Sequence, residues 1–136
     1  MLKVFRHTTT ATVPERQTEG AAGYDLSSDE DCCIEAGQQR LITTGISIIT
    51  TPHVYARIAP RSGLSVRSHC AIGAGVVDSD YRGEVKVLLQ NLGTESVKIR
   101  QGEPIAQLIL ERIETPEVVE IDHCGEQNTT QGSTGT

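Results

Sequence analysis

The chain has 136 residues, a formal net charge of −6 and a sequence pI near 5.1, which suits one domain with its own core. The Lys and Arg residues are scattered, whereas proteins that bind nucleic acid carry a basic patch or stripe, so we expect no nucleic-acid partner. No apolar run approaches the roughly 18 residues of a membrane span, and the N-terminus MLKVFRHTTT carries no signal-peptide pattern, so we expect no membrane partner.

Cysteine usage favours a reducing compartment. Cys32, Cys33, Cys70 and Cys124 form no C-x-x-C pair, and free thiols are the simpler interpretation. Their spacing relative to the histidines matches no zinc ribbon or finger. The expected location is therefore intracellular, in the cytoplasm or the nucleus.

Short strands are expected along most of the chain. Proline and glycine separate stretches rich in Val, Ile, Thr and Leu, namely ARIAP, GEVKVLLQN, ESVKIRQG and IAQLILERI. In GEVKVLLQN, alternation predicts that Val85, Val87 and Leu89 share one face. No stretch of 12 or more residues has a helical apolar stripe, and one helical turn is expected around GLSVRSH. The pattern predicts an all-β sandwich, jelly roll or barrel over residues 1–124, with 125–136 as a flexible tail.

Two irregular stretches interrupt the first half of the strand pattern. In EGAAGYDLSS (19–28), small residues lead to Tyr24 and Asp25, which indicates either a simple turn or a carboxylate held near a metal or an arginine. In PRSGLS (60–65), Arg61 is a fixed cation, Ser62 a hydroxyl donor, and Gly63 permits close approach of backbone N–H groups. This composition suits a phosphate, and it also suits an ordinary serine-capped turn.

Two further stretches follow in the second half. GVVDSDYRGE (75–84) is predicted to be a tight hairpin with Gly75 and Gly83 at its base. Asp78 would then lie at the edge of a water-poor pocket, where a carboxylate can accept a proton from water, while an acidic turn remains the alternative. In GEPIAQLIL (102–110), Gln107 interrupts a buried strand, so its amide must find partners in the backbone or on a ligand.

Taken together and in this order, AGYDL (22–26), PRSGL (60–64), GVVDSDYRGE and GEPIAQLIL resemble the first four of the five motifs of the trimeric dUTPase family. The resemblance implies a distorted jelly roll, or β-barrel-like sandwich, that assembles as a homotrimer with sites at the subunit interfaces. It also implies Mg²⁺-dependent hydrolysis of dUTP to dUMP and pyrophosphate, which limits uracil incorporation into DNA and supplies dUMP for dTMP synthesis.

The resemblance also assigns roles to residues. Asp78 would activate the water that attacks the α-phosphorus, and Tyr81 would stack on deoxyribose and exclude a 2′-hydroxyl. The backbone of Gly75, Val76 and Val77, together with the main chain near Lys86, would pair with uracil. The triphosphate would be held by Arg61, Ser62, Gly63 and Gln107. Asp25 would act on Mg²⁺ through water or by fixing Arg61.

The fifth motif departs from the family pattern. The chain ends QNTTQGSTGT, and residues 125–136 contain neither the expected Phe nor the expected Arg. Gly132, Ser133 and Thr134 would still contact phosphate through backbone and hydroxyl groups. This departure keeps open a nucleotide-binding regulatory trimer with weak or no turnover. A dCTP deaminase of the same fold and a capsid-like structural subunit are further alternatives.

Overall fold

The computed structural model describes residues 1–125, apart from the side chain of Val66, and within them the chain is almost entirely β-structure. Short strands and a single helix of six residues confirm the all-β prediction and the isolated helical turn. The elements are β1 (Leu2–Arg6), β2 (Tyr24–Ser27), β3 (Cys32–Ile34), β4 (Gln39–Thr43), β5 (Ile46–Thr50), β6 (Val54–Ala59), α1 (Ser62–Arg67), β7 (Cys70–Gly73), β8 (Val76–Val77), β9 (Lys86–Asn91), β10 (Val97–Ile99) and β11 (Pro104–Arg112).

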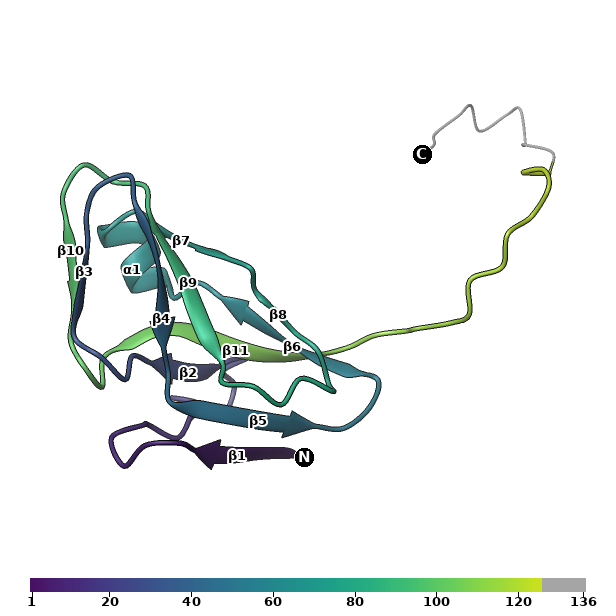
Figure 1. The fold of residues 1–136 in the computed structure, drawn as a ribbon, viewed down its shortest axis with the longest axis horizontal. Coiled ribbons are helices and arrows are strands. Elements are labelled where there is room, and N and C mark those ends of the chain that lie inside the picture. Colours follow the sequence, from purple (N-terminus) through teal and green to yellow (C-terminus); the bar gives the residue numbers. More distant parts are fainter. Residues whose placement is uncertain (126–136) are drawn as a thin grey trace.

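The strands form four small antiparallel sheets around one core. Their orders are β1-β5, β10-β3, β2-β11-β6-β8 and β4-β9-β7, so most neighbours in space are distant in sequence (Figure 1). Leu26 of β2, Ile42 of β4, Val87 of β9 and Ile105 of β11 are all 0% exposed and belong to the same apolar cluster. Because separate sheets share this cluster, the arrangement is the distorted jelly roll that the sequence predicts.

The alternation predicted for the stretch that contains β9 is confirmed. Val85, Val87 and Leu89 are buried, whereas Lys86 between them is exposed. The strand therefore places one face in the core and leaves the other toward solvent, as a period of two requires. This orientation places Lys86 on the outer surface next to the loop that precedes it.

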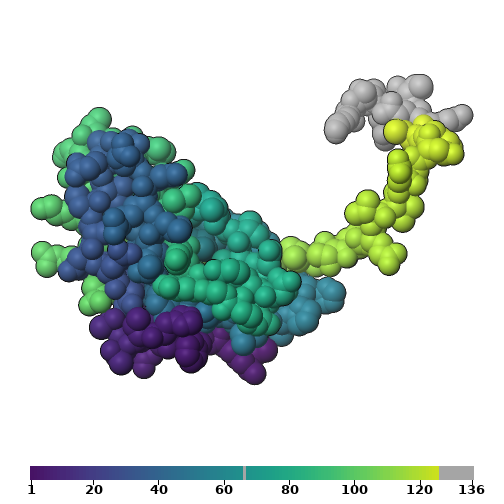
Figure 2. Space-filling model, in the orientation of Figure 1, coloured from purple at the N-terminus to yellow at the C-terminus, as the bar shows by residue number. Residues whose placement is uncertain are grey.

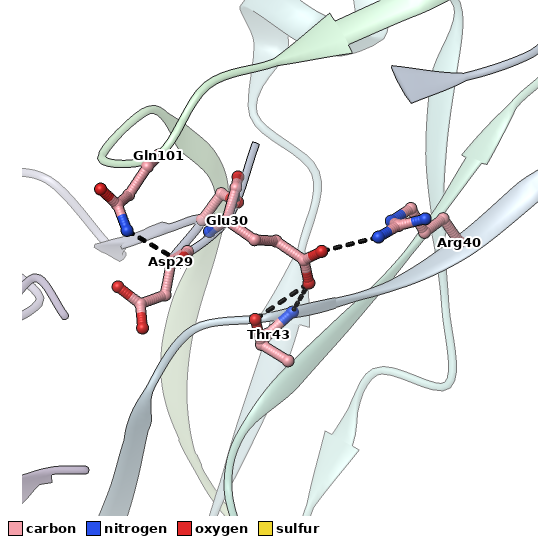
Figure 3. Close-up of polar contacts among 6 residues, drawn as sticks. Asp29, Glu30, Arg40, Thr43 and Gln101 are labelled. Carbon is pink, nitrogen blue, oxygen red and sulfur yellow. Dashed lines mark hydrogen bonds and ion pairs between the residues drawn. The ribbon is translucent and has the colours of Figure 1, made fainter. Parts of the chain in front are cut away.

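A carboxylate ties the turn after β2 to β4. Glu30 Oε1 accepts a hydrogen bond from Arg40 Nη2 at 2.7 Å, and its Oε2 accepts bonds from the backbone N–H and the hydroxyl of Thr43 at 3.0 and 2.9 Å (Figure 3). Gln101 Nε2 also donates to the carbonyl of Asp29 at 3.1 Å. The Thr43 amide first, and then Arg40, lower the pKa of Glu30 against the opposing effect of burial.

The tight hairpin predicted for residues 75–84 is wrong in its pairing. β8 pairs with β6, through Val77 opposite Ala56 and Val76 opposite Arg57, and not with the chain that follows it. The N–H of Ile58 donates to the carbonyl of Gly75 at 2.8 Å, and a Cβ on Gly75 would lie 2.6 Å from the carbonyl oxygen of Ile58. Gly75 is therefore required for close approach to β6, a contact between distant segments that the local pattern does not reveal.

The last described segment leaves the body of the protein. Residues 113–125 contain no helix or strand and extend away from the sheets in Figures 1 and 2, where they are coloured yellow-green to yellow. Val118 and Val119 on this arm are 97% and 74% exposed. Among residues 1–125, no helix is long and apolar enough to cross a membrane.

Candidate functional site

The loop between β7 and β9 surrounds a cavity of about 240 Å³. Its lining combines apolar, acidic, aromatic and basic side chains, namely Leu41, Ile58, Ala74, Val76, Val77, Asp78, Tyr81, Glu84, Val85 and Lys86. Val77 is buried, whereas Val76 is 65% exposed and Asp78 is exposed, so the pocket is open in the single chain rather than water-poor. The structure thus places Asp78, Tyr81 and Lys86 around one cavity.

The backbone beside this cavity retains free hydrogen-bonding capacity. β8 is the last strand in the order β2-β11-β6-β8, so only one of its edges is paired within the described residues. The N–H and C=O groups of its other edge can therefore read the edge of a planar heterocycle. Beyond β8, the N–H of Tyr81 donates to the carbonyl of Asp78 at 3.1 Å, which closes the turn between the two candidate side chains.

A second group of predicted residues meets across three strands. In the sheet, Gln107 of β11 lies between Asp25 of β2 and Ala59 of β6. Arg61 follows β6, and its Nε lies 3.3 Å from Asp25 Oδ1. Gln107 Nε2 donates to the carbonyl of Pro60 at 3.0 Å. Stretches 22–26, 60–64 and 102–110 therefore converge on one point, as the family resemblance led us to expect.

Small and backbone groups make this convergence possible. A Cβ on Gly23 would lie 2.2 Å from Gln107 Oε1, so only glycine leaves room for the amide. Arg61 Nη1 also donates to the carbonyl of Pro104 at 3.5 Å. Because a backbone carbonyl makes this contact, proline at position 104, where the family often has a basic residue, does not remove it.

The helix after Arg61 begins with polar groups turned to the surface. Ser62 is exposed, Gly63 is half-buried, and the residue before the helix makes no side-chain capping bond. No acidic side chain lies in the first turn of α1. The serine-capped turn considered from the sequence is therefore absent, and the hydroxyl of Ser62 stays available to a ligand.

The cavity that Asp78 lines and the residues that gather around Arg61 lie apart within one chain. Val77 pairs with Ala56, while Arg61 follows five residues later on the same extended segment. Five residues of strand span roughly 16 Å at about 3.3 Å per residue. Asp78 continues beyond Ala56 in the opposite direction, so Asp78 and Arg61 of one chain do not face the same point.

The sequence did not predict two features of the site. Leu41 lines the cavity from β4. Neighbouring residues on a strand face opposite sides, so the fully buried Ile42 next to it indicates that Leu41 faces outward. Gln17 Nε2 donates to Asp25 Oδ2 at 2.7 Å, for which the sequence gives no local signal.

Two further predictions concern the tail residues that would contact phosphate and the side chains that could bind a metal ion. Gly132, Ser133 and Thr134 lie outside residues 1–125. Within that range, no three His, Cys, Asp or Glu side chains gather in a way that could hold a metal ion, and all four cysteines are free thiols. Asp25 is paired to Arg61, one of the predicted phosphate-binding residues.

Comparison with known proteins identifies this combination of fold and residues. The dUTPase family model matches residues 9–136. The chain is 47% identical over 130 residues to the deoxyuridine 5'-triphosphate nucleotidohydrolase of avian adenovirus 8, covering 96% of this chain and 78% of that protein. It is 48% identical over 128 residues to the enzyme of the same name from Paramecium bursaria Chlorella virus 1, covering 92% and 91%.

Solved structures agree on the fold. The dUTPase of Staphylococcus bacteriophage 80alpha superposes with a TM-score of 0.87 at 25% identity, covering 93% of this chain and 99% of that one. A variant of the same phage enzyme superposes with a TM-score of 0.91 at 24% identity, covering 100% and 96%. With a family match over nearly its whole length and relatives at almost half identity, the chain belongs to the dUTPase family.

Proposed function

We propose that this chain hydrolyses dUTP to dUMP and pyrophosphate. The observation that carries the proposal is that Asp78 and Tyr81 line one cavity beside the free backbone edge of β8. The relatives named above are deoxyuridine triphosphate nucleotidohydrolases, and the similarity to them covers 96% and 92% of this chain. The activity would limit uracil incorporation into DNA and supply dUMP for dTMP synthesis.

Asp78 is the proposed general base. Within residues 1–125, no hydrogen bond or ion pair occupies its carboxylate, so that group is free to accept a proton from water. The water attacks the α-phosphorus in line, its oxygen forms the new P–O bond, and the proton passes to Asp78. The bond to the bridging oxygen breaks, and pyrophosphate leaves with the electron pair.

Tyr81 and the β8 backbone are proposed to select the nucleoside. The ring of Tyr81 is 44% exposed and offers a flat face on which deoxyribose would stack, and this stacking would leave no space for a ribose 2′-hydroxyl. The free edge of Val76 and Val77, with Gly75 and the main chain near Lys86, would pair with uracil. Leu41 adds an apolar wall to the same cavity.

Arg61, Ser62, Gly63 and Gln107 are proposed to hold the triphosphate. The Asp25–Arg61 contact at 3.3 Å and the Gln107–Pro60 bond at 3.0 Å fix these groups before a ligand arrives. Mg²⁺ would fit beside the single carboxylate of Asp25, because this ion keeps several waters and needs few carboxylates. Asp25 would hold its water shell, and the bound ion would neutralise charge on the phosphates. The related phage phi11 dUTPase coordinates a structural Mg(II) ion.

The separation of the cavity that Asp78 lines from the residues around Arg61 supports an assembly of more than one chain. Asp78 and Arg61 of one chain are separated by the length of β6, so a complete site requires Asp78 and Arg61 from different copies. The extended arm after β11 presents Val118, Val119 and Ile121 to solvent, and burying them on another copy would stabilise such an assembly. The threefold number itself comes from the family resemblance.

The proposed enzyme consists of one β-structured domain, residues 1–124, and a tail, residues 125–136. The tail would supply Gly132, Ser133 and Thr134 to phosphate, without the aromatic lid and the arginine of the family pattern. Loss of positioning and water exclusion can cost several kcal/mol of barrier lowering, so we expect a reduced rate. The four free thiols support a reducing intracellular compartment.

Pyrophosphate release from dUTP with Mg²⁺ tests the proposal. We expect Asp78→Ala to lower kcat by about 100-fold or more, because a positioned general base contributes at least that factor. Asp80→Ala is the matched control, since Asp80 lies in the same loop but does not line the cavity. Equal activity of the wild type and Asp78→Ala would contradict the proposed base.

The altered tail favours a second candidate, a nucleotide-binding regulatory trimer with weak or no turnover. The bacteriophage 80alpha dUTPase controls transfer of virulence genes by a G protein-like mechanism, so regulation is known for a protein of this fold. Calorimetric titration with a non-hydrolysable dUTP analogue separates the two functions. Tight binding without product from dUTP would establish the regulatory alternative over the enzyme.

A further inference from the structure

The segment that follows Tyr81 is attached to β5 rather than to β8. This returning arm, residues 82–85, lies along the start of β5 and is held there by backbone and side-chain bonds. The N–H of Val85 donates to the carbonyl of Ile46 at 2.8 Å, and the hydroxyl of Thr44 donates to the carbonyl of Val85. Ser47 Oγ lies 2.8 Å from the carbonyl oxygen of Gly83.

The carboxylate of Glu84 adds a charged contact between this arm and the turn before β5. Its Oε2 accepts a hydrogen bond from the backbone N–H of Gly45 at 2.8 Å. The carbonyl of Gly45 in turn accepts a bond from the N–H of His7 at 2.7 Å, just after β1. Hydrogen bonds to an ionised acceptor are stronger than neutral ones, so this contact anchors the returning arm to the turn between β4 and β5, and Gly45 in that turn does not line the cavity.

Tyr81 depends on the returning arm for its own position. Its hydroxyl donates to the backbone carbonyl of Glu84 at 2.8 Å, and its ring lies over Gly83, where no side chain intervenes. The ring is 44% exposed, so burial alone holds it weakly. The N–H of Tyr81 also closes the turn onto the carbonyl of Asp78. A displacement of Glu84 would therefore move Tyr81 and, through the turn, Asp78.

We propose that Glu84 is a positioning residue: by accepting the Gly45 amide it fixes the returning arm and thereby orients Tyr81 and Asp78 at the cavity. This inference rests on the proposed hydrolysis of dUTP and deepens it. It gives a role to the last residue of the GVVDSDYRGE stretch, to which the sequence assigned none. Glu84 itself lines the cavity but acts here through Tyr81.

Glu30 provides a matched control for a purely structural role. Its Oε2 accepts the backbone N–H of Thr43 at 3.0 Å, the same kind of bond in the same protein, at a turn that does not line the cavity. The alanine variants of Glu30 and Glu84 each remove one carboxylate that accepts a backbone amide. Only the Glu84 variant should change the discrimination between dUTP and UTP, which depends on the Tyr81 ring.

The experiment compares Glu84→Ala, Glu84→Gln and Glu30→Ala with the wild type. We expect Glu84→Ala to lower kcat/KM for dUTP about tenfold, chiefly through KM, and to reduce the preference for dUTP over UTP. Glu84→Gln should stay within about twofold of the wild type, because its amide oxygen still accepts the Gly45 N–H. Glu30→Ala should lower Tm and leave the dUTP/UTP ratio unchanged.

Tyrosine NMR signals test the role of Glu84 without measuring turnover, so this test is independent of whether the chain hydrolyses dUTP. The chain has three tyrosines and no tryptophan, so ring NMR signals can be assigned with Tyr81→Phe. In Glu84→Ala the Tyr81 signals should shift while those of the other tyrosines stay. Unchanged Tyr81 signals together with an unchanged dUTP/UTP ratio would overturn the positioning role.

Two further outcomes are also decisive. A wild type without turnover would refute dUTP hydrolysis, and the tyrosine signals would still test the positioning role. If Glu84→Ala does not fold, Glu84→Asp takes its place, because a side chain shorter by one methylene keeps the charge but falls short of the Gly45 amide. Wild-type Tyr81 signals in that variant would overturn the proposal, and shifted signals would support it.

Discussion

Gly23→Ala should damage the group of residues that is proposed to hold the triphosphate. The new Cβ would lie 2.2 Å from Gln107 Oε1 and 2.9 Å from both Cδ and Cβ of Gln107. Rotation about the side-chain bonds of Gln107 can move Oε1 and Cδ away, but the Cβ of Gln107 is fixed by the backbone of β11. Relief therefore requires a shift of β2 against β11, or of both strands.

The cost follows from two contributions. Overpacking in a well-packed region costs about 1–3 kcal/mol, and losing the bond from Gln107 to the carbonyl of Pro60 costs about 1 kcal/mol. We therefore expect Gly23→Ala to lower the free energy of unfolding by about 2–4 kcal/mol. Because Pro60 precedes Arg61, KM for dUTP should rise as well.

Urea unfolding of Gly23→Ala beside Gly20→Ala measures this cost. Gly20 is exposed and no atom lies within 4 Å of its would-be Cβ, so its alanine variant should change stability by no more than about 0.5 kcal/mol. Adding Gln107→Ala to Gly23→Ala removes the clashing Oε1 and Cδ and keeps only the contact with Cβ, so the double variant should be less destabilised than the sum of the single changes. Equal stability of the two glycine variants, or strictly additive effects, would refute the steric argument.

Three further predictions concern other contacts. Glu30→Gln should lower the free energy of unfolding by about 1–2 kcal/mol at neutral pH. Because the folded-state pKa of Glu30 is lowered, this difference in stability should be complete above the ordinary pKa of 4.5 and should vanish as pH falls through the folded-state pKa. Urea unfolding at a series of pH values measures it. Gly75→Ala should weaken binding of a non-hydrolysable dUTP analogue in calorimetry, since its Cβ meets the immovable carbonyl of Ile58 at 2.6 Å. Asn91→Ala should cost about 2–3 kcal/mol in urea unfolding with kcat unchanged, since the fully buried amide donates to the carbonyl of Ile34 at 2.9 Å.

Local patterns were sufficient to predict which faces of the strands are buried. The alternation around Val85 and Val87 reports which side chains avoid water, and that preference is the same in any β-sheet. The convergence of Asp25, Arg61 and Gln107 was also accessible, because their stretches carry a family resemblance as a set. Their individual roles remain predictions.

Contacts between distant segments were not accessible from local patterns. The pairing of β8 with β6 depends on the approach of Gly75 to Ile58, and a glycine before two valines fits a tight hairpin equally well. The bond from Gln17 to Asp25 joins a loop to a strand and leaves no periodic signal. Leu41 was overlooked because one outward apolar side chain on a strand is common on protein surfaces.

In the proposed trimer, β6 would link two sites of the assembly. Along this strand, Ala56 pairs with the segment that carries Asp78, while the other end leads directly to Arg61. In a trimer whose sites lie between copies, one chain would give its Asp78 to one site and its Arg61 to another. A shift in the register of β6 would then disturb two sites at once, so β6 must be held firmly. Its pairing on one side with β11, over Val54 to Ala59, supplies that rigidity.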